Sequence, residues 1–410
     1  MAHILFLTEV LPYPLDAGPK IRAYYVLRHL AEQHSVTLVS FIRKDDQKAY
    51  VEHLETFCRH VCTVNMQRSL TKDVESMLRS LVTGKPFVIL RDNVREMKLG
   101  LQELVSLGAY DVIHADQMSM AQFALYARRT IRESNPALKT KVVLDAHNAL
   151  YRVFAQIAPS QRDPLHRWGW QRETRLMEKY EKATCRRFDH VVFVTDEDRR
   201  ALVDSGANNG HSIIPICVDL DDRPLLDVDP QAQTITHLGT MFWPPNVEGV
   251  IWFAREVFPR VQETIPGAQF VIIGKNPPKE IDQLLEENEN ILVTGYMPNP
   301  KPYLTKTAGF IVPLHAGAGM RVKILDAWAW GLPVVTTTVG REGIDVDAGN
   351  TALVADDPDT FAQHIVDLLN NADLRARLRT KGRAWVAEKY NWQRIYARWD
   401  NVYEELLAKA

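Results

Sequence analysis

The chain has 410 residues, more than one ordinary domain needs, and its formal net charge at pH 7 is only −2. It contains no run of 18 apolar residues and no basic stripe interleaved with aromatic residues, so we expect neither a membrane span nor nucleic-acid binding. Its four cysteines are scattered without neighbouring metal ligands, which favours reduced thiols over a zinc site.

The first half of the chain alternates short apolar runs with amphipathic stretches. The runs typical of buried strands are residues 3–7, 35–41, 61–64, 111–114, 141–146 and 190–195. Helical patterns between most of them predict a doubly wound parallel sheet. A polar, proline-containing stretch at 219–233 is typical of a linker, so we expect the first domain to cover residues 1–216.

A turn-rich loop follows the first predicted strand. Gly18 suits a helix cap and Pro19 the first helical position, while Lys20 and Arg22 place positive charge in the first turn. Cations at a helix N-terminus are unfavourable unless an anion lies in front of them. We therefore expect Gly18 and Arg22 to belong to an anion-binding loop at the carboxyl edge of the sheet.

The second half repeats the alternation of strands and helices. Its strand-like runs are residues 234–238, 269–273, 291–294, 309–314, 333–336 and 352–354. They predict a second doubly wound α/β domain over residues 217–384. The aromatic-rich stretch from Trp385 to Leu407 predicts one long amphipathic helix, and we expect residues 385–410 to pack on the first domain.

A second glycine-rich loop follows the predicted strand at 309–314. Gly317 and Gly319 precede a helix whose start carries Arg321 and Lys323, and this helix ends at Gly331. Like the N-terminal loop, this loop combines glycines with cations at the start of the following helix, a combination typical of a diphosphate site. Two such loops facing each other would form a ligand-binding cleft between the domains.

The sequence after this loop resembles the GT-B glycosyltransferases of family 4, a retaining group. The matching stretch is LDAWAWGLPVV at 325–335, and further matches are His237-Leu238-Gly239-Thr240 and Ile272-Ile273-Gly274. The resemblance implies two Rossmann-like domains facing a cleft. It also implies a nucleotide sugar bound mainly on the C-terminal domain, with the acceptor approaching from the N-terminal domain.

The resemblance assigns the donor site to residues of the second half, with departures from the family pattern. The family motif has two glutamates eight positions apart; Asp326 takes the second place, for the ribose hydroxyls, and Ala318 the first. Cations usual after Leu238 are missing here, so we expect Arg321 and Lys323 to neutralise the leaving diphosphate. The remaining expected donor-binding positions, by backbone hydrogen bonds or stacking, are Gly239, Gly274, Tyr296, Ala318, Gly319 and Met320.

On the acceptor side, two predicted strands end in polar residues. Asp116 stands where relatives often carry a functional histidine, and it either contacts substrate or caps the helix beginning near Met118. His147 follows another strand at the same edge, as a proton acceptor or hydrogen-bonding group, with a structural histidine as the rival reading. We expect Asp116, His147, Arg321 and Lys323 to be the catalytic residues.

Retention is the stereochemical outcome that the resemblance implies, although Asp116 as a general base would suit inversion equally well. Three Asp-x-Asp patterns, at 219–221, 227–229 and 345–347, fit solvated turns better than metal sites, so we expect no metal and no cofactor besides the donor substrate. The alternatives are a nucleotide-sugar 2-epimerase and a non-catalytic nucleotide-sugar-binding protein.

The sequence leaves three acceptor classes open: a glycan, a lipid-linked glycan and a small molecule. The process that we expect is polysaccharide biosynthesis. No secretory signal is expected, which favours the cytoplasm or the inner face of the membrane. Residues 1–216 hold 30 Lys and Arg against 25 Asp and Glu. One basic and aromatic stretch suggests peripheral contact with a membrane, with ordinary helix packing as the rival: Arg167, Trp168, Trp170, Arg172 and Arg175.

Overall fold

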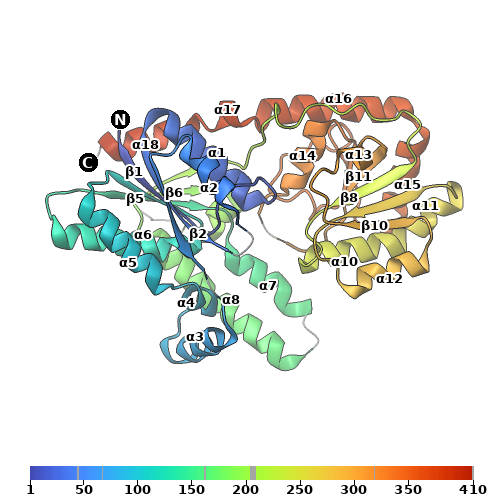
Figure 1. Ribbon diagram of the computed structural model, residues 1–410. Coiled ribbons are helices and arrows are strands. Elements are labelled where there is room, and N and C mark those ends of the chain that lie inside the picture. Colours follow the sequence, from blue (N-terminus) through green and yellow to red (C-terminus); the bar gives the residue numbers. More distant parts are fainter. Residues whose placement is uncertain (44–45, 67, 161–162, 204–208, 318, 409–410) are drawn as a thin grey trace. The chain divides into compact units, whose positions relative to one another are not determined.

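The computed structural model describes residues 1–410 apart from 44–45, 67, 161–162, 204–208, 318 and 409–410 (Figure 1). The chain divides into two compact units. The first comprises Met1–Ile216 together with Trp392–Ala410, and the second comprises Cys217–Asn391. Each unit is an α/β structure around one parallel sheet, as the alternation of strands and helices predicts.

The first unit contains a seven-stranded sheet in the order β3-β2-β1-β4-β5-β6-β7, with every neighbouring pair parallel. Its strands are β1 (His3–Thr8), β2 (Ser35–Ile42), β3 (His60–Asn65), β4 (Val112–Asp116), β5 (Lys141–Ala146), β6 (His190–Phe193) and β7 (Gly210–Ile213). Strand β7 was not among the predicted strands. The strand order reverses between β1 and β4, and the carboxyl ends beside such a switch point are where open α/β sheets bind ligands.

The helices of the first unit cover both faces of its sheet: in Figure 1, α1 and α18 lie on one face and α5 and α6 on the other. They are α1 (Gly18–Gln33), α2 (Lys48–Glu55), α3 (Leu70–Thr83), α4 (Phe87–Arg91), α5 (Arg95–Leu107), α6 (Met118–Ser134), α7 (Leu150–Ser160), α8 (Pro164–Cys185), α9 (Asp196–Leu202), α17 (Trp392–Ile395) and α18 (Arg398–Ala408). Burial on both faces of the sheet explains why β5 is a nearly continuous apolar run.

The second unit contains a six-stranded parallel sheet in the order β10-β9-β8-β11-β12-β13. Its strands are β8 (Thr234–Leu238), β9 (Gln269–Ile273), β10 (Ile291–Gly295), β11 (Thr307–Val312), β12 (Val334–Thr336) and β13 (Leu353–Val354). The switch point lies between β8 and β11. The loop after each of these two strands is one that the sequence assigns to the donor.

The helices of the second unit pack an aromatic core in which Phe253 contacts the rings of Phe270 and Phe361. They are α10 (Pro244–Trp252), the π-helical turn η1 (Phe253–Val257), α11 (Phe258–Thr264), α12 (Lys279–Glu287), α13 (Lys301–Leu304), α14 (Val322–Trp330), α15 (Pro358–Asn370) and α16 (Ala372–Lys389).

The prediction of one long helix over residues 385–407 is wrong. Helix α16 ends at Lys389, and two shorter helices, α17 and α18, follow. The Tyr390 hydroxyl accepts a hydrogen bond from the Asp345 amide, and the Tyr390 carbonyl accepts one from Val218, both within the second unit. The expected segment is therefore divided, with residues 385–391 in the second unit and residues 392–410 in the first.

Candidate functional site

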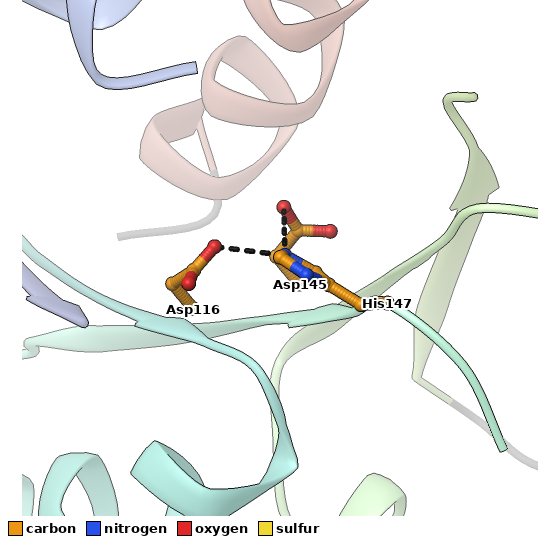
Figure 2. A group of neighbouring side chains, drawn as sticks. All are labelled: Asp116, Asp145 and His147. Atoms are coloured by element: carbon orange, nitrogen blue, oxygen red, sulfur yellow. Dashed lines mark hydrogen bonds and ion pairs between the residues drawn. The ribbon is translucent and has the colours of Figure 1, made fainter. Parts of the chain in front are cut away.

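The first unit gathers charged side chains at the carboxyl ends of β4 and β5, beside its switch point. Asp116 is the last residue of β4 and is fully buried, and His147 directly follows β5. Figure 2 shows the His147 ring between two carboxylates: Nε2 lies 2.8 Å from Asp116 Oδ1 and 3.6 Å from Asp145 Oδ2. The predicted pair, Asp116 and His147, is thus in direct contact.

Asp116 does not cap the following helix, so that alternative reading is wrong. Helix α6 begins at Met118 and its N-cap is Gln117, which adopts a left-handed φ of 74°. The Asp116 carboxylate instead accepts hydrogen bonds from His147 and, at 3.4 Å, from the Gln117 amide. Its partners therefore lie within the polar group at the sheet edge.

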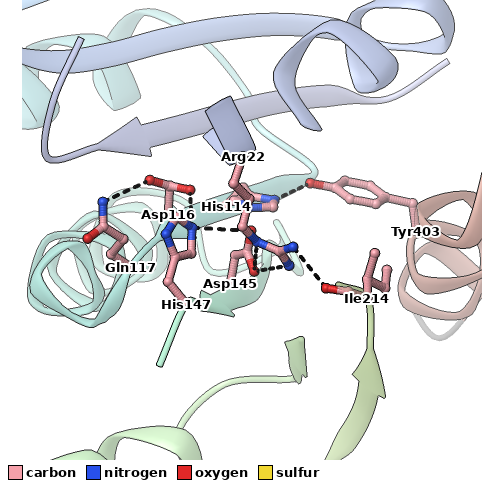
Figure 3. Close-up of polar contacts among 8 residues, drawn as sticks. All are labelled: Arg22, His114, Asp116, Gln117, Asp145, His147, Ile214 and Tyr403. Atoms are coloured by element: carbon pink, nitrogen blue, oxygen red, sulfur yellow. Dashed lines mark hydrogen bonds and ion pairs between the residues drawn. The ribbon is translucent and has the colours of Figure 1, made fainter. Parts of the chain in front are cut away.

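Arg22 is fully buried, and its guanidinium donates to both Asp145 oxygens at 2.6 to 3.0 Å and to the Ile214 carbonyl at 2.8 Å (Figure 3). The Arg22 guanidinium is thus paired with a carboxylate of its own unit, and donor binding by Arg22 stays a prediction. The cap of α1 is Ala17, and Gly18 is the first helical residue. Arg22 thus holds Asp145, a residue that sequence reasoning did not assign.

These four buried groups determine one another's charge. Burial alone would raise the pKa of Asp145, but the Arg22 guanidinium and His147 together outweigh burial and lower it. Burial alone would lower the pKa of His147, but Asp116 and Asp145 outweigh it and raise that pKa to about 9. The formal charges of two carboxylates, one guanidinium and one imidazolium sum to zero. This neutrality limits the free-energy cost of burying the four groups.

A metal ion is a poor fit to this group. The ligand atoms of Asp116, Asp145 and His147 lie within 4.8 Å of one another, close enough to share an ion. However, the Arg22 guanidinium already occupies Asp145 with two of its nitrogens, and His147 Nε2 carries the proton that it shares with the carboxylates. Binding a cation there would require both the arginine and the proton to leave.

His114, also on β4, has a structural role beside Asp116, Asp145 and His147. Its ring stacks on Phe6 with a centroid distance of 4.2 Å, and its Nδ1 lies 2.8 Å from the Tyr403 hydroxyl of α18 (Figure 3). Burial lowers the pKa of His114 to about 3, so the ring is neutral at physiological pH. Tyr403 thereby links the C-terminal helix to the centre of the first sheet.

In the second unit, Lys323 lies in the first turn of α14, at the switch point between β8 and β11. Its Nζ donates to Asn246 Oδ1 at 2.9 Å and lies 3.5 Å from His237 Nε2. His237 is fully buried, with Nδ1 3.1 Å from the Ile311 carbonyl; since a carbonyl only accepts, Nδ1 carries the proton and Nε2 presents a lone pair to Lys323.

Gly239 leaves the space that Lys323 occupies. A Cβ atom at this position would lie 2.7 Å from Lys323 Nζ and 3.1 Å from the Asn246 amide nitrogen. Burial, and then the neighbouring Arg321 charge, lower the pKa of Lys323 to about 7. The amine therefore gains or loses its charge near neutral pH, according to what binds beside it.

Arg321 has different surroundings, although it is only two positions away. It is the N-cap of α14 and is buried, with Nη1 donating to the Gly319 carbonyl at 2.9 Å and Nη2 3.8 Å from Glu342. A Cβ atom at Gly317, where φ is 133°, would lie 2.7 Å from Arg321 Nη2, so the loop wraps closely around the guanidinium. Of the other predicted loop residues, Met320 is buried, and Ala318 lies outside the described residues.

Asp326 lies one turn further along α14 and is engaged by a residue that the sequence did not single out. Arg223 Nε donates to Asp326 Oδ1 at 2.9 Å, and the Arg223 guanidinium lies 5.6 Å from the centre of the Trp330 ring. Burial raises the pKa of Asp326, and Arg223 opposes that shift. Binding of the ribose hydroxyls by Asp326 stays a prediction.

The loops after β8 and β9 cross closely at two of the predicted glycines. A Cβ atom at Gly274 would lie only 1.9 Å from the Gly239 carbonyl oxygen, so no larger residue fits there. Tyr296, after β10, is 54% exposed, and Lys275 Nζ lies 5.8 Å from the centre of its ring. An exposed aromatic face of this kind can stack on a nucleobase.

Asn246 and His237 are the residues of this site that sequence reasoning missed. The available signal was a polar side chain just inside the helix that follows β8, directly after Pro244 and Pro245. A buried asparagine at such a position needs hydrogen-bond partners, and here they are Lys323 and the Thr240 carbonyl.

Two family models match the chain. Residues 18–222 match the model described as Glycosyltransferase Family 4, and residues 232–371 match Glycosyl transferases group 1. An uncharacterized 44.6 kDa protein in the cps region of Klebsiella pneumoniae is 22% identical over 408 residues, covering 97% of this chain and 98% of that protein. The capsular polysaccharide biosynthesis glycosyltransferase CapM of Staphylococcus aureus is 27% identical over 149 residues, covering 35% of this chain and 39% of CapM.

Solved structures share the architecture over the whole chain. HepE of Anabaena, in complex with UDP and glucose, has a TM-score of 0.70 at 12% identity and covers 99% of this chain and 100% of that one. Sucrose-phosphate synthase from Thermosynechococcus elongatus has a TM-score of 0.69 at 15% identity, with complete coverage of both chains. At these identities the likeness shows the fold alone. Among the described residues, no helix is both long and apolar enough to cross a membrane.

Proposed function

Because the chain belongs to glycosyltransferase family 4, whose model matches half of it, we propose that it transfers a sugar from a nucleoside-diphosphate sugar to an acceptor hydroxyl. The observation that carries the proposal is Lys323, a half-buried amine at the N-terminus of α14 and at the switch point of a parallel sheet. Its hydrogen-bonding partners, Asn246 and His237, are both neutral. A diphosphate would supply the negative charge that this position favours.

The donor phosphates are proposed to lie against Lys323 and the first amide groups of α14. A diphosphate leaving group develops charge as the bond to the sugar breaks, and a fixed cation in a dry site stabilises that charge. Arg321 contributes a second, permanent positive charge behind the loop, and Asp326 is assigned to the ribose. The HepE structures with UDP and with UDP-glucose support a nucleotide-sugar donor.

Asp116 and His147 are proposed to bind substrate hydroxyls. With a pKa of about 9, His147 is an imidazolium at neutral pH, which makes it a hydrogen-bond donor rather than a general base. Its Nδ1 is buried and makes no hydrogen bond within the described part of the chain, and a substrate oxygen would satisfy it. Asp116 and His147 therefore position the substrate, and the carboxylates of Asp116 and Asp145 keep His147 charged.

Transfer with retention and without a metal is the mechanism that these roles favour. The acceptor oxygen forms its bond to the anomeric carbon on the face from which the phosphate departs, and its proton passes to the departing phosphate oxygen. No protein base is needed on this route, in keeping with the protonated His147. Lys323, Arg321 and the α14 dipole take the part that a metal ion plays in other transferases.

A glycan or lipid-linked glycan is the acceptor class that we propose. CapM is named for capsular polysaccharide biosynthesis, and the Klebsiella relative is named for its place in the cps region. Both names support a role in making a polysaccharide rather than in modifying a small molecule.

The test is to incubate the purified chain with UDP-, GDP- and ADP-sugars, with and without glycan acceptors, and to follow nucleotide release and product. One donor is expected to be hydrolysed slowly and transferred faster, with EDTA having no effect and NMR showing a retained anomeric configuration. Lys323→Ala is expected to lower kcat strongly, whereas Lys306→Ala, a change at the amino end of β11, leaves it unchanged. Interconversion of donors without an acceptor would indicate an epimerase, and tight donor binding without turnover a binding protein; either outcome contradicts the proposal.

A further inference from the structure

Helix α3 turns its apolar side to solvent. Six large apolar residues of this one helix are between 46% and 88% exposed: Leu70, Val74, Met77, Leu78, Leu81 and Val82. The residues of α3 that are buried are Ser76 and Ser80. This arrangement is the reverse of an ordinary surface helix, which buries its apolar stripe.

The exposed residues form one continuous stripe. Counting from Leu70, five of them fall at helical spacings of 4, 7, 8 and 11 residues, which places them on one face. Ser76 and Ser80 lie on the opposite face. The six-residue set is called the α3 stripe below.

Polar contacts hold α3 in this orientation. Arg172 of α8 donates from Nη2 to the Ser80 carbonyl at 2.7 Å and from Nη1 to the Ser80 hydroxyl at 3.0 Å. The Ser80 hydroxyl in turn donates to the Lys85 carbonyl at 2.7 Å. Ser69 caps the N-terminus, and Gly84 ends the helix in a left-handed conformation. The helix is therefore well defined, and its anchor is the serine face.

The segment that contains the stripe carries an excess of positive charge. Residues 68–98 contain seven Lys or Arg against four Asp or Glu. Arg79, Lys85 and Lys98 lie close enough that burial, followed by Arg79 and Lys85, lowers the pKa of Lys98. The acidic residues of α3 are Asp73 and Glu75, and Glu75 pairs with Arg79 at 3.7 Å.

Helix α8 exposes two further large apolar side chains near its N-terminal end. Leu165 and Trp168 are 71% and 56% exposed and share a helix face with Arg172, the residue that binds Ser80. Figure 1 shows α3 beside α4 and α8, on the outside of the first unit. The other aromatic residue of this stretch, Trp170, packs on Phe154 at 5.3 Å, so the basic and aromatic stretch noted in the sequence is only partly exposed.

We propose that the α3 stripe docks on the surface of a lipid bilayer that contains anionic lipids. The aliphatic side chains enter the boundary between headgroups and acyl chains, and Arg79, Lys85 and Lys98 face the lipid phosphates. An aliphatic stripe with a basic rim, formed by Arg79, Lys85 and Lys98, suits a bilayer surface, whereas protein interfaces concentrate aromatic and arginine side chains at their centre. None of these residues belongs to the donor or acceptor groups described above.

Vesicle flotation of the full chain tests this proposal. Phosphatidylcholine vesicles are compared with vesicles in which about a third of the lipid is phosphatidylglycerol, and the anionic ones are expected to carry the protein. The double variant Val74→Glu/Leu78→Glu removes two exposed side chains from the stripe and is expected to lower partitioning by about tenfold or more. The matched control is Leu285→Glu/Leu292→Glu, at two exposed leucines of the second unit, which keeps wild-type partitioning.

The rim is tested separately with Arg79→Glu/Lys85→Glu, which is expected to abolish the preference for anionic vesicles. Circular dichroism checks that each variant is folded, as expected for changes at exposed positions. Failure of the wild-type chain to float, or equal flotation of the stripe variant, overturns the proposal. A dimer in light scattering that the stripe variant disperses, without vesicle binding, assigns the surface to a second copy instead. Donor hydrolysis is measured on the same samples, so a negative flotation result leaves the proposed transferase activity standing.

Discussion

Binding of a nucleoside diphosphate is expected to take up a proton at Lys323. In the free protein, burial and Arg321 lower the pKa of this amine to about 7 from its ordinary 10.5. At pH 8 roughly a tenth of the side chain is therefore charged, and a bound diphosphate that restores the ordinary pKa would make the uptake about 0.9 proton. Above pH 7 the affinity is expected to fall by about tenfold per pH unit, because the uncharged amine must first be protonated.

Isothermal titration calorimetry in buffers with different ionisation enthalpies measures this uptake directly. At pH 8 the terminal phosphate has already lost its protons and His237 is neutral, so Lys323 is the group expected to change. Lys323→Arg keeps the charge at every pH and should bind without proton uptake, while Lys306→Arg should behave as the wild type. No uptake in the wild-type chain, or the same uptake in Lys323→Arg, would refute the reasoning.

Three further predictions concern the polar groups at the two sheet edges. Arg22→Met is expected to lower the free energy of unfolding by about 3–5 kcal/mol because it leaves Asp145 buried without its partner, and the double variant Arg22→Met/Asp145→Leu should recover part of this loss in urea denaturation. His147→Gln should lower the free energy of unfolding most below pH 6.5, and the loss should vanish as the pH rises through about 9, because the pKa of His147 is raised in the folded protein. Urea denaturation midpoints of the variant and the wild type across this pH range measure the loss, and a loss that grows with pH would contradict the prediction. Asn246→Asp places a carboxylate 2.9 Å from Lys323, which should weaken diphosphate binding and reduce the proton uptake, and unchanged titrations would argue against their contact.

Local sequence patterns were sufficient for the architecture. Parallel strands buried on both faces favour nearly continuous apolar runs, and such runs at β1, β5 and β11 can be recognised from the sequence. The prediction of two Rossmann-like domains of the GT-B class is confirmed by both sheets and by the structural neighbours. Strand β7 escaped prediction because its pattern, half-exposed at the sheet edge, lacks such a run.

The C-terminal helix shows the limit of periodicity. The apolar spacing of residues 385–407 is correct for each helix, since Trp399, Val402, Tyr403 and Leu406 of α18 are all buried. The break between α16 and α17 depends on hydrogen bonds from Val218 and Asp345 to Tyr390, which lie far away in sequence. Local helix propensity cannot reveal hydrogen-bond partners that lie this far away in the sequence.

The sequence by itself determined the strand-loop-helix units, the positions of the loops at the carboxyl ends of strands, and the presence of Lys323 and His147 in them. Their chemical states were decided by tertiary structure. Lys323 meets Asn246 and His237 across 77 and 86 positions of chain, and Arg22 meets Asp145 across 123. A side chain's charge depends on its burial and on its charged neighbours, and both arise only when distant segments pack together.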